Sequence, residues 1–120
     1  MLRPRFALPA AFATLTLATA LLAGGARGQE PRVVEIAAKR FAFTPAEVVL
    51  KAGEPVVLRL HSEDVTHGFF HRGLGIDATI EPGKTVEVPL RPTTPGRYTV
   101  ICDHFCGSGH GNMKLTLVVE

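Results

Sequence analysis

The stretch "GRYTVICDHFCGSGHGNMKLTLVV", residues 96–119, decides the fold class. Its two flanks alternate apolar and polar residues with a period of two, which is typical of half-buried β-strands. A Gly-rich segment, residues 102–113, separates the flanks. The stretch therefore predicts two strands joined by a loop at one pole of a β-structure. Cys102 is expected at the end of the first strand, facing the core.

The same alternation recurs upstream. In "PVVLRLHSED", residues 55–64, the side chains of Val56, Leu58 and Leu60 share one face and the intervening residues share the other. Other short apolar runs are separated by turns rich in Gly and Pro, and no segment after residue 28 has a convincing helical period. Regularly spaced short strands of this kind predict an all-β domain, an antiparallel sandwich or barrel.

The first 28 residues have the pattern of a secretory signal. Two arginines in "MLRPR" precede the uncharged run "FALPAAFATLTLATALLAG", and small residues follow before Gln29. We expect residues 1–28 to be a cleaved signal peptide and residues 29–120 to be an exported, periplasmic domain. The alternative is an uncleaved membrane anchor facing the periplasm, since Phe6–Leu22 is near the shortest length that spans a bilayer.

The charge balance gives no sign of a nucleic-acid partner. The chain has 13 Lys and Arg against 11 Asp and Glu, but three of the arginines lie in residues 1–28. The expected mature domain therefore carries 10 basic and 11 acidic side chains. Without a basic stripe, nucleic acid is not an expected partner, and the membrane is one only if the first segment is uncleaved.

Residues 102–113 contain both cysteines of the chain, two of its five histidines and Met113. A disulfide between Cys102 and Cys106 would close a very short ring worth roughly 2 kcal/mol, and would leave His110 and Met113 without a role. A catalytic thiol with His110 as its base would leave the second cysteine unexplained. Zinc could use both cysteines, His110 and a distant histidine. The thioether of Met113 favours copper, because zinc rarely takes this ligand.

A copper site on this loop needs a further imidazole from elsewhere in the chain. The segment "SEDVTHGFFH", residues 62–71, follows the alternating strand and is expected to reach the same pole. We expect His67 to be the ligand from this segment. His71 is expected to be non-ligating, and His61 to lie on the outer face of its strand.

The sequence resembles a known family over nearly all of residues 33–119. "FAFTPAEVVLKAGEPVVLRLHSEDVTHGF" resembles the opening strands of cupredoxins. "CDHFCGSGHGNM" resembles the loop of the binuclear copper A (CuA) centre, Cys-x₃-Cys-x₃-His-x₂-Met, of haem-copper oxidase subunit II and nitrous oxide reductase. "DVTHGF" resembles the segment with that family's first histidine. The resemblance implies a cupredoxin-like Greek-key β-sandwich or barrel.

The resemblance also implies a ligand set for two copper ions. Two thiolates would bridge the metals, one imidazole would bind each, and a thioether and a backbone carbonyl would be weak ligands. In that order the residues are Cys102 and Cys106, His67 and His110, Met113, and the carbonyl of His104. Phe69, Phe70 and Phe105 are expected to pack around the centre.

The implied function is electron transfer by a module that is not itself an enzyme. Its partners would be a cytochrome c-like donor and an oxidase or reductase acceptor. The chain has no Trp, and His104 stands where oxidases commonly have a Glu, so a free-standing exported domain is expected. Three alternatives stay open: copper handling or delivery for oxidase assembly, an anchored accessory oxidase subunit, and a redox-switched disulfide or zinc domain.

Overall fold

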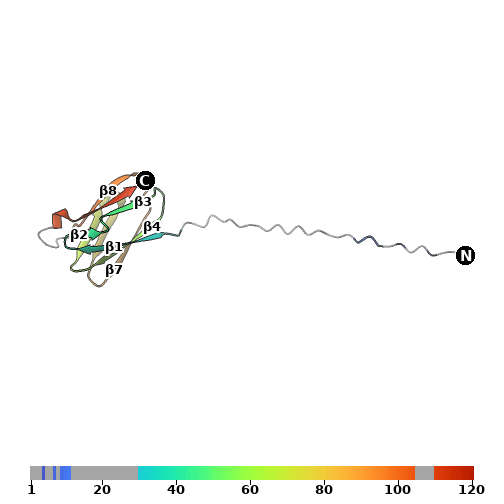
Figure 1. The fold of residues 1–120 in the computed structure, drawn as a ribbon, viewed down its shortest axis with the longest axis horizontal. Helices are drawn as coiled ribbons and strands as arrows, with labels where there is room; N and C mark the ends of the chain where they lie inside the picture. Colours follow the sequence, from blue (N-terminus) through green and yellow to red (C-terminus); the bar gives the residue numbers. More distant parts are fainter. Residues whose placement is uncertain (1–3, 5–6, 8, 12–29, 105–109) are drawn as a thin grey trace.

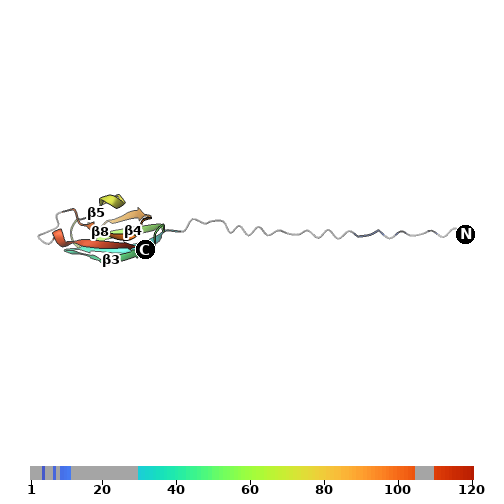
Figure 2. The same cartoon turned by 90° about the horizontal axis from the view of Figure 1, so that it is seen from above.

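The computed structural model describes residues 4, 7, 9–11, 30–104 and 110–120. Residues 30–104 and 110–120 form a two-layer β-sandwich, seen from two directions in Figures 1 and 2. The prediction of an all-β fold is confirmed, with two short 3₁₀ turns as the helical elements of the described residues. In chain order the elements are β1 (Arg32–Lys39), β2 (Ala42–Thr44), β3 (Glu47–Leu50), β4 (Val56–Ser62), β5 (His67–His71), η1 (Arg72–Leu74), β6 (Ile76–Ile80), β7 (Thr85–Leu90), β8 (Gly96–Ile101), η2 (His110–Asn112) and β9 (Lys114–Val119).

The two sheets have strand orders β2-β1-β4-β7 and β3-β9-β8-β5-β6. Most neighbouring strands are antiparallel, but β1 pairs with β4 in parallel, and β3 pairs with β9 in parallel. The expectation of an antiparallel sandwich was therefore wrong for these two pairs. Period-two alternation fixes which face each residue occupies and carries no information on strand direction.

The parallel pairs arise because the chain crosses from one sheet to the other between β2 and β3. β2 ends at Thr44, and Pro45 and Ala46 carry the chain to β3 in the second sheet. Pro45 has no backbone N–H to donate to a ladder, so this position suits the end of a strand. The Ala46 carbonyl accepts from the Thr116 N–H at 2.9 Å, which fastens β3 to β9 at once after the crossing.

The core lies between the sheets and follows the predicted alternation. On β4, Val56, Leu58 and Leu60 are buried, and the residues between them are partly exposed. β9 buries Leu115 and Leu117 in the same way. Phe43 of the first sheet meets Phe69 of the second edge to face, with ring centroids 5.3 Å apart and an interplanar angle of 82°. This aromatic pair joins the two layers.

The strand directions define two poles of the sandwich. β1 and β4 end, and β5 and β9 begin, at one pole, where η2 also lies (Figure 1). At the other pole the β3–β4 turn is bonded to the C-terminus, through the Ala52 N–H and the Glu120 carbonyl at 2.8 Å. We call the first the loop pole and the second the C-terminal pole.

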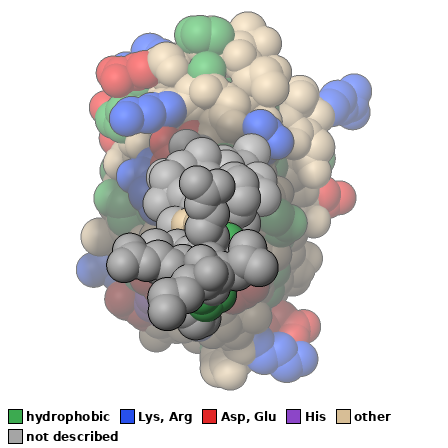
Figure 3. All heavy atoms as spheres, turned by 90° about the vertical axis from the view of Figure 1, so that its right-hand side faces the viewer, with side chains coloured by type: hydrophobic (Ala, Val, Ile, Leu, Met, Phe, Trp, Pro, Cys, Tyr) green, Lys and Arg blue, Asp and Glu red, His purple; other side chains and the backbone are tan. Residues whose placement is uncertain are grey.

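Figure 3 views the molecule from the end opposite η2. Basic and acidic side chains are interspersed over the described part of this face. Ion pairs such as Arg32 Nε to Glu54 Oε1, at 3.0 Å, contribute to that mixture. In the part of the chain that the structure describes, no helix has the length and apolar character needed to cross a membrane.

Candidate metal centre

Three of the predicted ligand residues are buried at the loop pole. His67 is the first residue of β5, Cys102 directly follows β8, and Met113 directly precedes β9. Their exposed fractions are 0%, 4% and 1%. His67 is the only buried polar residue in the described part of the chain. A thiol, a thioether and an imidazole are therefore withdrawn from water at one end of the fold.

Two hydrogen bonds from backbone N–H groups join distant parts of the chain at this pole. The Cys102 N–H donates to the Met113 carbonyl at 3.1 Å, so the two ends of the segment 102–113 are joined. The Gly68 N–H donates to Cys102 Sγ at 3.3 Å, across 34 positions of sequence. The second bond follows from the antiparallel pairing of β5 with β8, in which Phe70 faces Ile101.

Gly68 permits this close approach because it has no side chain. A Cβ placed on Gly68 would lie 1.9 Å from Asp103 Oδ1 and 2.9 Å from the backbone nitrogens of both Asp103 and His104. Contacts under 3.0 Å to backbone atoms cannot be relieved by a side-chain rotation. The sequence interpretation missed this residue, although a Gly directly after a candidate ligand is a recognisable sign of close backbone approach.

The His67 ring has one nitrogen with a partner and one without. Nε2 lies 2.7 Å from Asp64 Oδ1. Nδ1 is buried and has no hydrogen-bond partner among the described residues. A buried polar atom left unpaired costs on the order of 1–3 kcal/mol unless another group uses its lone pair. A metal ion bound at Nδ1 would use it.

Asp64 is held by several donors in the turn between β4 and β5. Its oxygens accept from the Val65 N–H at 2.6 Å and the Arg40 N–H at 2.8 Å, as well as bonding His67. Burial alone would raise the pKa of Asp64, but the hydrogen bonds from Arg40, His67 and Val65 together lower it to about 2. Asp64 is therefore an anion at neutral pH. It was not among the predicted site residues, although an Asp three positions before a ligand histidine could have suggested it.

The Cys102 thiol is free in the structure and lies against the segment that follows it. Its Sγ is 3.3 Å from the carbonyl oxygen of His104. The group of His104 that lies near the thiol is its backbone oxygen, and the residue itself is exposed. Thiolate sulfur, imidazole nitrogen and thioether sulfur are a soft donor set that fits copper.

The structure does not describe the side chains of two predicted ligands, Cys106 and His110. Cys106 lies outside the described residues, as do Phe105 and the rest of 105–109. The backbone of His110 begins η2, but its side chain is not described. Among the side chains that are described, no three of the types His, Cys, Asp and Glu cluster closely enough to hold a metal ion.

The other two histidines lie away from these ligands. His71 ends β5, four residues from His67 and thus about 13 Å along the strand at ~3.3 Å per residue. Its Nδ1 accepts from the Leu74 N–H at 3.1 Å, and its ring meets that of Tyr98 at 5.6 Å between centroids. His61 is partly exposed on β4, on the face opposite to Leu60. The expectation that His61 lies on the outer face of its strand is confirmed, and the non-ligating role of His71 stays a prediction.

Two aromatic side chains, Phe43 and Phe69, belong to the same buried cluster as Cys102 and Met113. Phe69, two residues from His67, is fully buried against Phe43. Phe70 points to the other side of β5 and is partly exposed. Phe69 thus fits the expected packing role better than Phe70 does.

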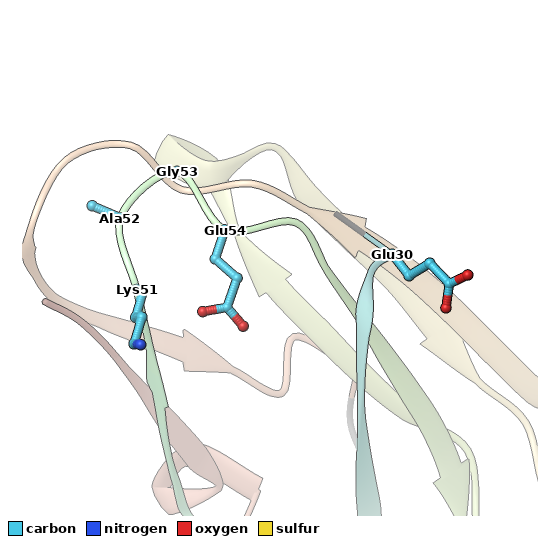
Figure 4. A pocket seen from close by; sticks show the side chains of 5 residues that line it. All are labelled: Glu30, Lys51, Ala52, Gly53 and Glu54. Carbon is cyan, nitrogen blue, oxygen red and sulfur yellow. The ribbon is translucent and has the colours of Figure 1, made fainter. Parts of the chain in front are cut away.

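A hollow on the described surface lies away from these residues. It has a volume of about 690 Å³ and lies around the β3–β4 turn, at the C-terminal pole (Figure 4). It is lined by Glu30, Lys51, Ala52, Gly53 and Glu54. These residues include no sulfur or imidazole ligand, so the hollow is separate from the candidate metal centre.

A two-sheet sandwich with a Cys- and His-bearing loop between its last two strands defines a cupredoxin. The Cupredoxin-like domain family matches residues 9–119 of this chain, and the chain belongs to that family. The resemblance to cupredoxins of the oxidase subunit II and nitrous oxide reductase type is confirmed by individual relatives.

Cytochrome c oxidase subunit 2 of Thermus thermophilus is 34% identical over 93 residues, which are 78% of this chain and 69% of that protein. A second Thermus thermophilus subunit 2 has the same identity, and the match covers 55% of it. The nitrous-oxide reductase of Cupriavidus necator is 33% identical over 91 residues, 72% of this chain and 14% of that protein. The chain thus spans between a seventh and about two thirds of these relatives.

A solved structure supports the fold assignment. The periplasmic domain of subunit II of the cytochrome oxidase of Bradyrhizobium japonicum superimposes with a TM-score of 0.70 at 16% identity. The match covers 77% of this chain and 86% of that one. At this identity the likeness concerns the fold alone.

Proposed function

We propose that this chain is a copper-binding electron-transfer protein with a binuclear, CuA-type centre at the loop pole. The observation that carries the proposal is the 3.3 Å bond from the Gly68 N–H to Cys102 Sγ, which joins the residue after His67 to the start of the loop. His67 presents a buried nitrogen without a partner in the described structure at this place. Relatives named cytochrome c oxidase subunit 2 and nitrous-oxide reductase, at 33–34% identity, add to this support.

The proposed ligands come from both strand ends of the loop pole. Two copper ions would be held by the thiolates of Cys102 and Cys106 and the imidazoles of His67 and His110, with Met113 and the carbonyl of His104 as weaker donors. Copper held there would supply one-electron chemistry, accepting an electron from a reduced donor protein and passing it to an oxidised acceptor. Thiolates bind the metal deprotonated, so the transfer needs no accompanying proton.

The chain itself contributes rigidity and exclusion of water. The ends of the segment 102–113 are joined by the bond from the Cys102 N–H to the Met113 carbonyl, and Phe69 lies in the same buried cluster as both residues. Burial of His67, Cys102 and Met113 to 4% exposure or less favours electron transfer over copper delivery, because delivery needs ligands that can exchange. A low-dielectric wall also tunes the potential of a metal centre.

We further propose that the protein is a module and not a complete enzyme. Its donor would be a cytochrome c-like protein and its acceptor an oxidase or reductase, by analogy with the names of its relatives. Residues 1–28 would be an export signal that is removed before Gln29, which leaves residues 29–120 in the periplasm. Mass spectrometry of the chain recovered from its native host tests this: a mass beginning at Gln29 is expected, and an intact first segment would favour a membrane-anchored protein.

Copper titration with electron paramagnetic resonance tests the centre. The purified metal-free chain is expected to take up two copper ions. The spectrum is expected to show hyperfine splitting from one unpaired electron shared over two equivalent copper nuclei. The variant Cys102→Ser is expected to lose the shared pattern, because one thiolate cannot provide both bridges. One copper per chain with a single-nucleus pattern in the unmodified protein would refute the binuclear centre.

A further inference from the structure

The outer face of the second sheet carries a row of four side chains, one from each of four neighbouring strands. The strand registers pair Asp77 of β6 with Phe70 of β5, Phe70 with Ile101 of β8, and Ile101 with Lys114 of β9. Neighbouring strands lie about 4.8 Å apart, so the row is about 14 Å long. We call these four residues the cross-strand row.

The cross-strand row points away from the core. Each of its members is next in sequence to a buried residue of the core, as Ile101 is to the fully buried Val100. Successive residues of a strand point to opposite faces, so the four side chains share the outer face. Ile101 has an exposed fraction of 44%, Phe70 is partly exposed, and the two charged residues at the ends of the row are exposed.

The charges at the two ends of the row are not paired with each other or with their neighbours. The side chains of Asp77 and Lys114 make no hydrogen bond or ion pair with any other residue that the structure describes. Arg97 and Glu47 on the same face differ in this respect, because Arg97 Nη2 lies 3.2 Å from Glu47 Oε2. Asp77 and Lys114 are therefore available to charges on another molecule.

The order acidic, apolar, apolar, basic makes the row complementary to itself. Consider a second copy stacked on this face about a two-fold axis that runs parallel to the strands, between β5 and β8. Asp77 then faces Lys114 of the second copy, and Phe70 faces its Ile101. The symmetry makes each contact twice, as in any isologous interface. Stacked sheets commonly lie about 10 Å apart with their strands within about 30° of each other, so the arrangement is an ordinary one.

We infer that the cross-strand row is the centre of a weak, isologous dimer interface between two copies of this chain. The apolar pair would lie at the middle of the interface and the ion pairs at its rim, which is the usual layout. Because the row is short, the buried area is expected to fall below about 1,200 Å², the range of transient contacts. We expect a dissociation constant between about 10 μM and 1 mM. The row contains none of the proposed copper ligands, so the inference goes beyond the proposed function and does not depend on it.

Sedimentation velocity of the purified metal-free chain tests the association. A phosphine reductant in the buffer prevents disulfides between copies. The sedimentation coefficient is expected to rise with protein concentration between about 10 μM and 1 mM. The rise is expected to weaken when the ionic strength increases from about 0.1 M to 1 M, because the screening length falls from about 10 Å to 3 Å. A chain that is monomeric throughout this range, or a dimer that salt does not weaken, would overturn the inference.

Charge reversal tests which surface is used. Asp77→Lys and Lys114→Asp each place like charges opposite one another at both symmetric contacts. Each variant is expected to raise the dissociation constant about tenfold or more, since two exposed ion pairs become two repulsions. The double variant restores opposite charges and is expected to dimerise within a few-fold of the unmodified chain. Glu63→Lys, at an exposed residue of the β4–β5 turn, is the control with the same change of charge as Asp77→Lys. If the single reversals have no more effect than this control, or if the double variant fails to recover, the interface is not the cross-strand row.

The apolar middle of the row has its own test. Ile101→Thr keeps a β-branched residue on the strand and removes apolar area from the proposed interface, so weaker dimerisation is expected. The matched control is Val33→Thr, at a residue of β1 with 51% exposure on the other sheet. Equal dissociation constants for the two variants would contradict the role of Ile101.

Asp103 is the group on this face that opposes dimerisation. A Cβ on Gly68 would lie 1.9 Å from Asp103 Oδ1, so this carboxylate extends from the end of β8 over β5, close to the proposed axis. Two copies would bring two such carboxylates toward each other. We therefore expect Asp103→Asn to tighten the dimer several-fold, and more so at low salt than at high salt. Unchanged or weaker dimerisation in this variant would contradict the proposed axis.

The outcomes separate this inference from the proposed function and from another occupant of the row. A shared-electron copper spectrum from a chain that stays monomeric would leave the function in place and refute the dimer. A dimer that responds to the row variants, together with a single-nucleus copper spectrum, would do the reverse. If the chain is monomeric and the row variants instead slow its reduction by a cytochrome c-like donor, the row serves that donor and the inference is overturned.

Discussion

Replacement of Gly68 by Ala would separate the two strands that carry the candidate centre. The new Cβ would lie 1.9 Å from Asp103 Oδ1, a contact that rotation of the Asp103 side chain can relieve. It would also lie 2.9 Å from the backbone nitrogens of Asp103 and His104, and these contacts require the backbone itself to move. The movement would lengthen the bond from the Gly68 N–H to Cys102 Sγ, which is 3.3 Å in the native structure.

Two costs determine the size of the effect. Inserting a methyl group into a closely packed place costs typically about 1–3 kcal/mol, and loss of one buried hydrogen bond adds about 1 kcal/mol. We therefore expect Gly68→Ala to lower the free energy of unfolding by about 2–4 kcal/mol. For a domain of this size, that corresponds to a fall in Tm of roughly 10–30 °C.

Thermal unfolding of the metal-free chain, followed by circular dichroism, measures this effect. Gly111→Ala is the matched control, because a Cβ on Gly111 would meet no atom of the described residues within 4 Å. Its Tm is expected to change little, or to rise slightly through the smaller entropy of the unfolded chain. The copper-loaded Gly68→Ala chain is also expected to have altered charge-transfer bands in the visible spectrum. Equal Tm values and equal spectra for the two variants would refute the argument that β5 and residues 102–104 need this glycine.

Two other substitutions test the axial ligand and the buried aromatic pair. Met113→Leu is expected to keep the fold, since swaps of Leu and Met cost less than about 1.5 kcal/mol. It is expected to raise the reduction potential of the copper-loaded protein, because a sulfur donor to the oxidised metal is lost. The control is Leu115→Met, the reverse change on β9, which should leave the reduction potential measured in a redox titration unchanged. Equal potentials in both variants would argue against Met113 as a ligand. Phe43→Ala is expected to destabilise the domain by about 3–5 kcal/mol in urea unfolding, since it leaves a cavity beneath Phe69. Phe41→Ala, at a residue with 39% exposure, should cost much less, and a comparable loss would contradict the role of the buried pair.

The sequence predicted the faces of the strands and the location of the loop well. Alternation in residues 55–64 placed Leu58 and Leu60 in the core, where both are fully buried. The same rule placed Cys102 at the inner end of β8. Burial by alternate residues is a local property of a strand, so one short segment is enough to show it.

The pairing partners could not be predicted in the same way. The parallel pairs β1–β4 and β3–β9 join segments whose contact depends on the crossing at Pro45. Neither the direction nor the partner of a strand leaves a period in its sequence. The antiparallel expectation therefore failed where the chain changes sheets and succeeded for hairpins such as β8–β9.

The candidate centre shows a similar division. His67, Cys102 and Met113 were identified by residue type and spacing, and the structure buries all three at one pole. Asp64 and Gly68 were missed, because their importance lies in contacts with partners fixed only by the fold. A carboxylate in a turn and a glycine in a strand are too common to be selected from sequence alone. The ligand roles of all six residues, His67, Cys102, Cys106, His110, Met113 and the His104 carbonyl, stay predictions.

The bond between the Cys102 N–H and the Met113 carbonyl has an evolutionary consequence. It is the last bond between β8 and β9 before the intervening ten residues, so the pairing of these two strands uses none of the ten. We therefore expect that shortening, lengthening or exchanging these residues would leave the pairing of β8 with β9 in place. The limit on this exchange is set by Gly68, since any replacement must begin with a backbone that passes within contact distance of β5.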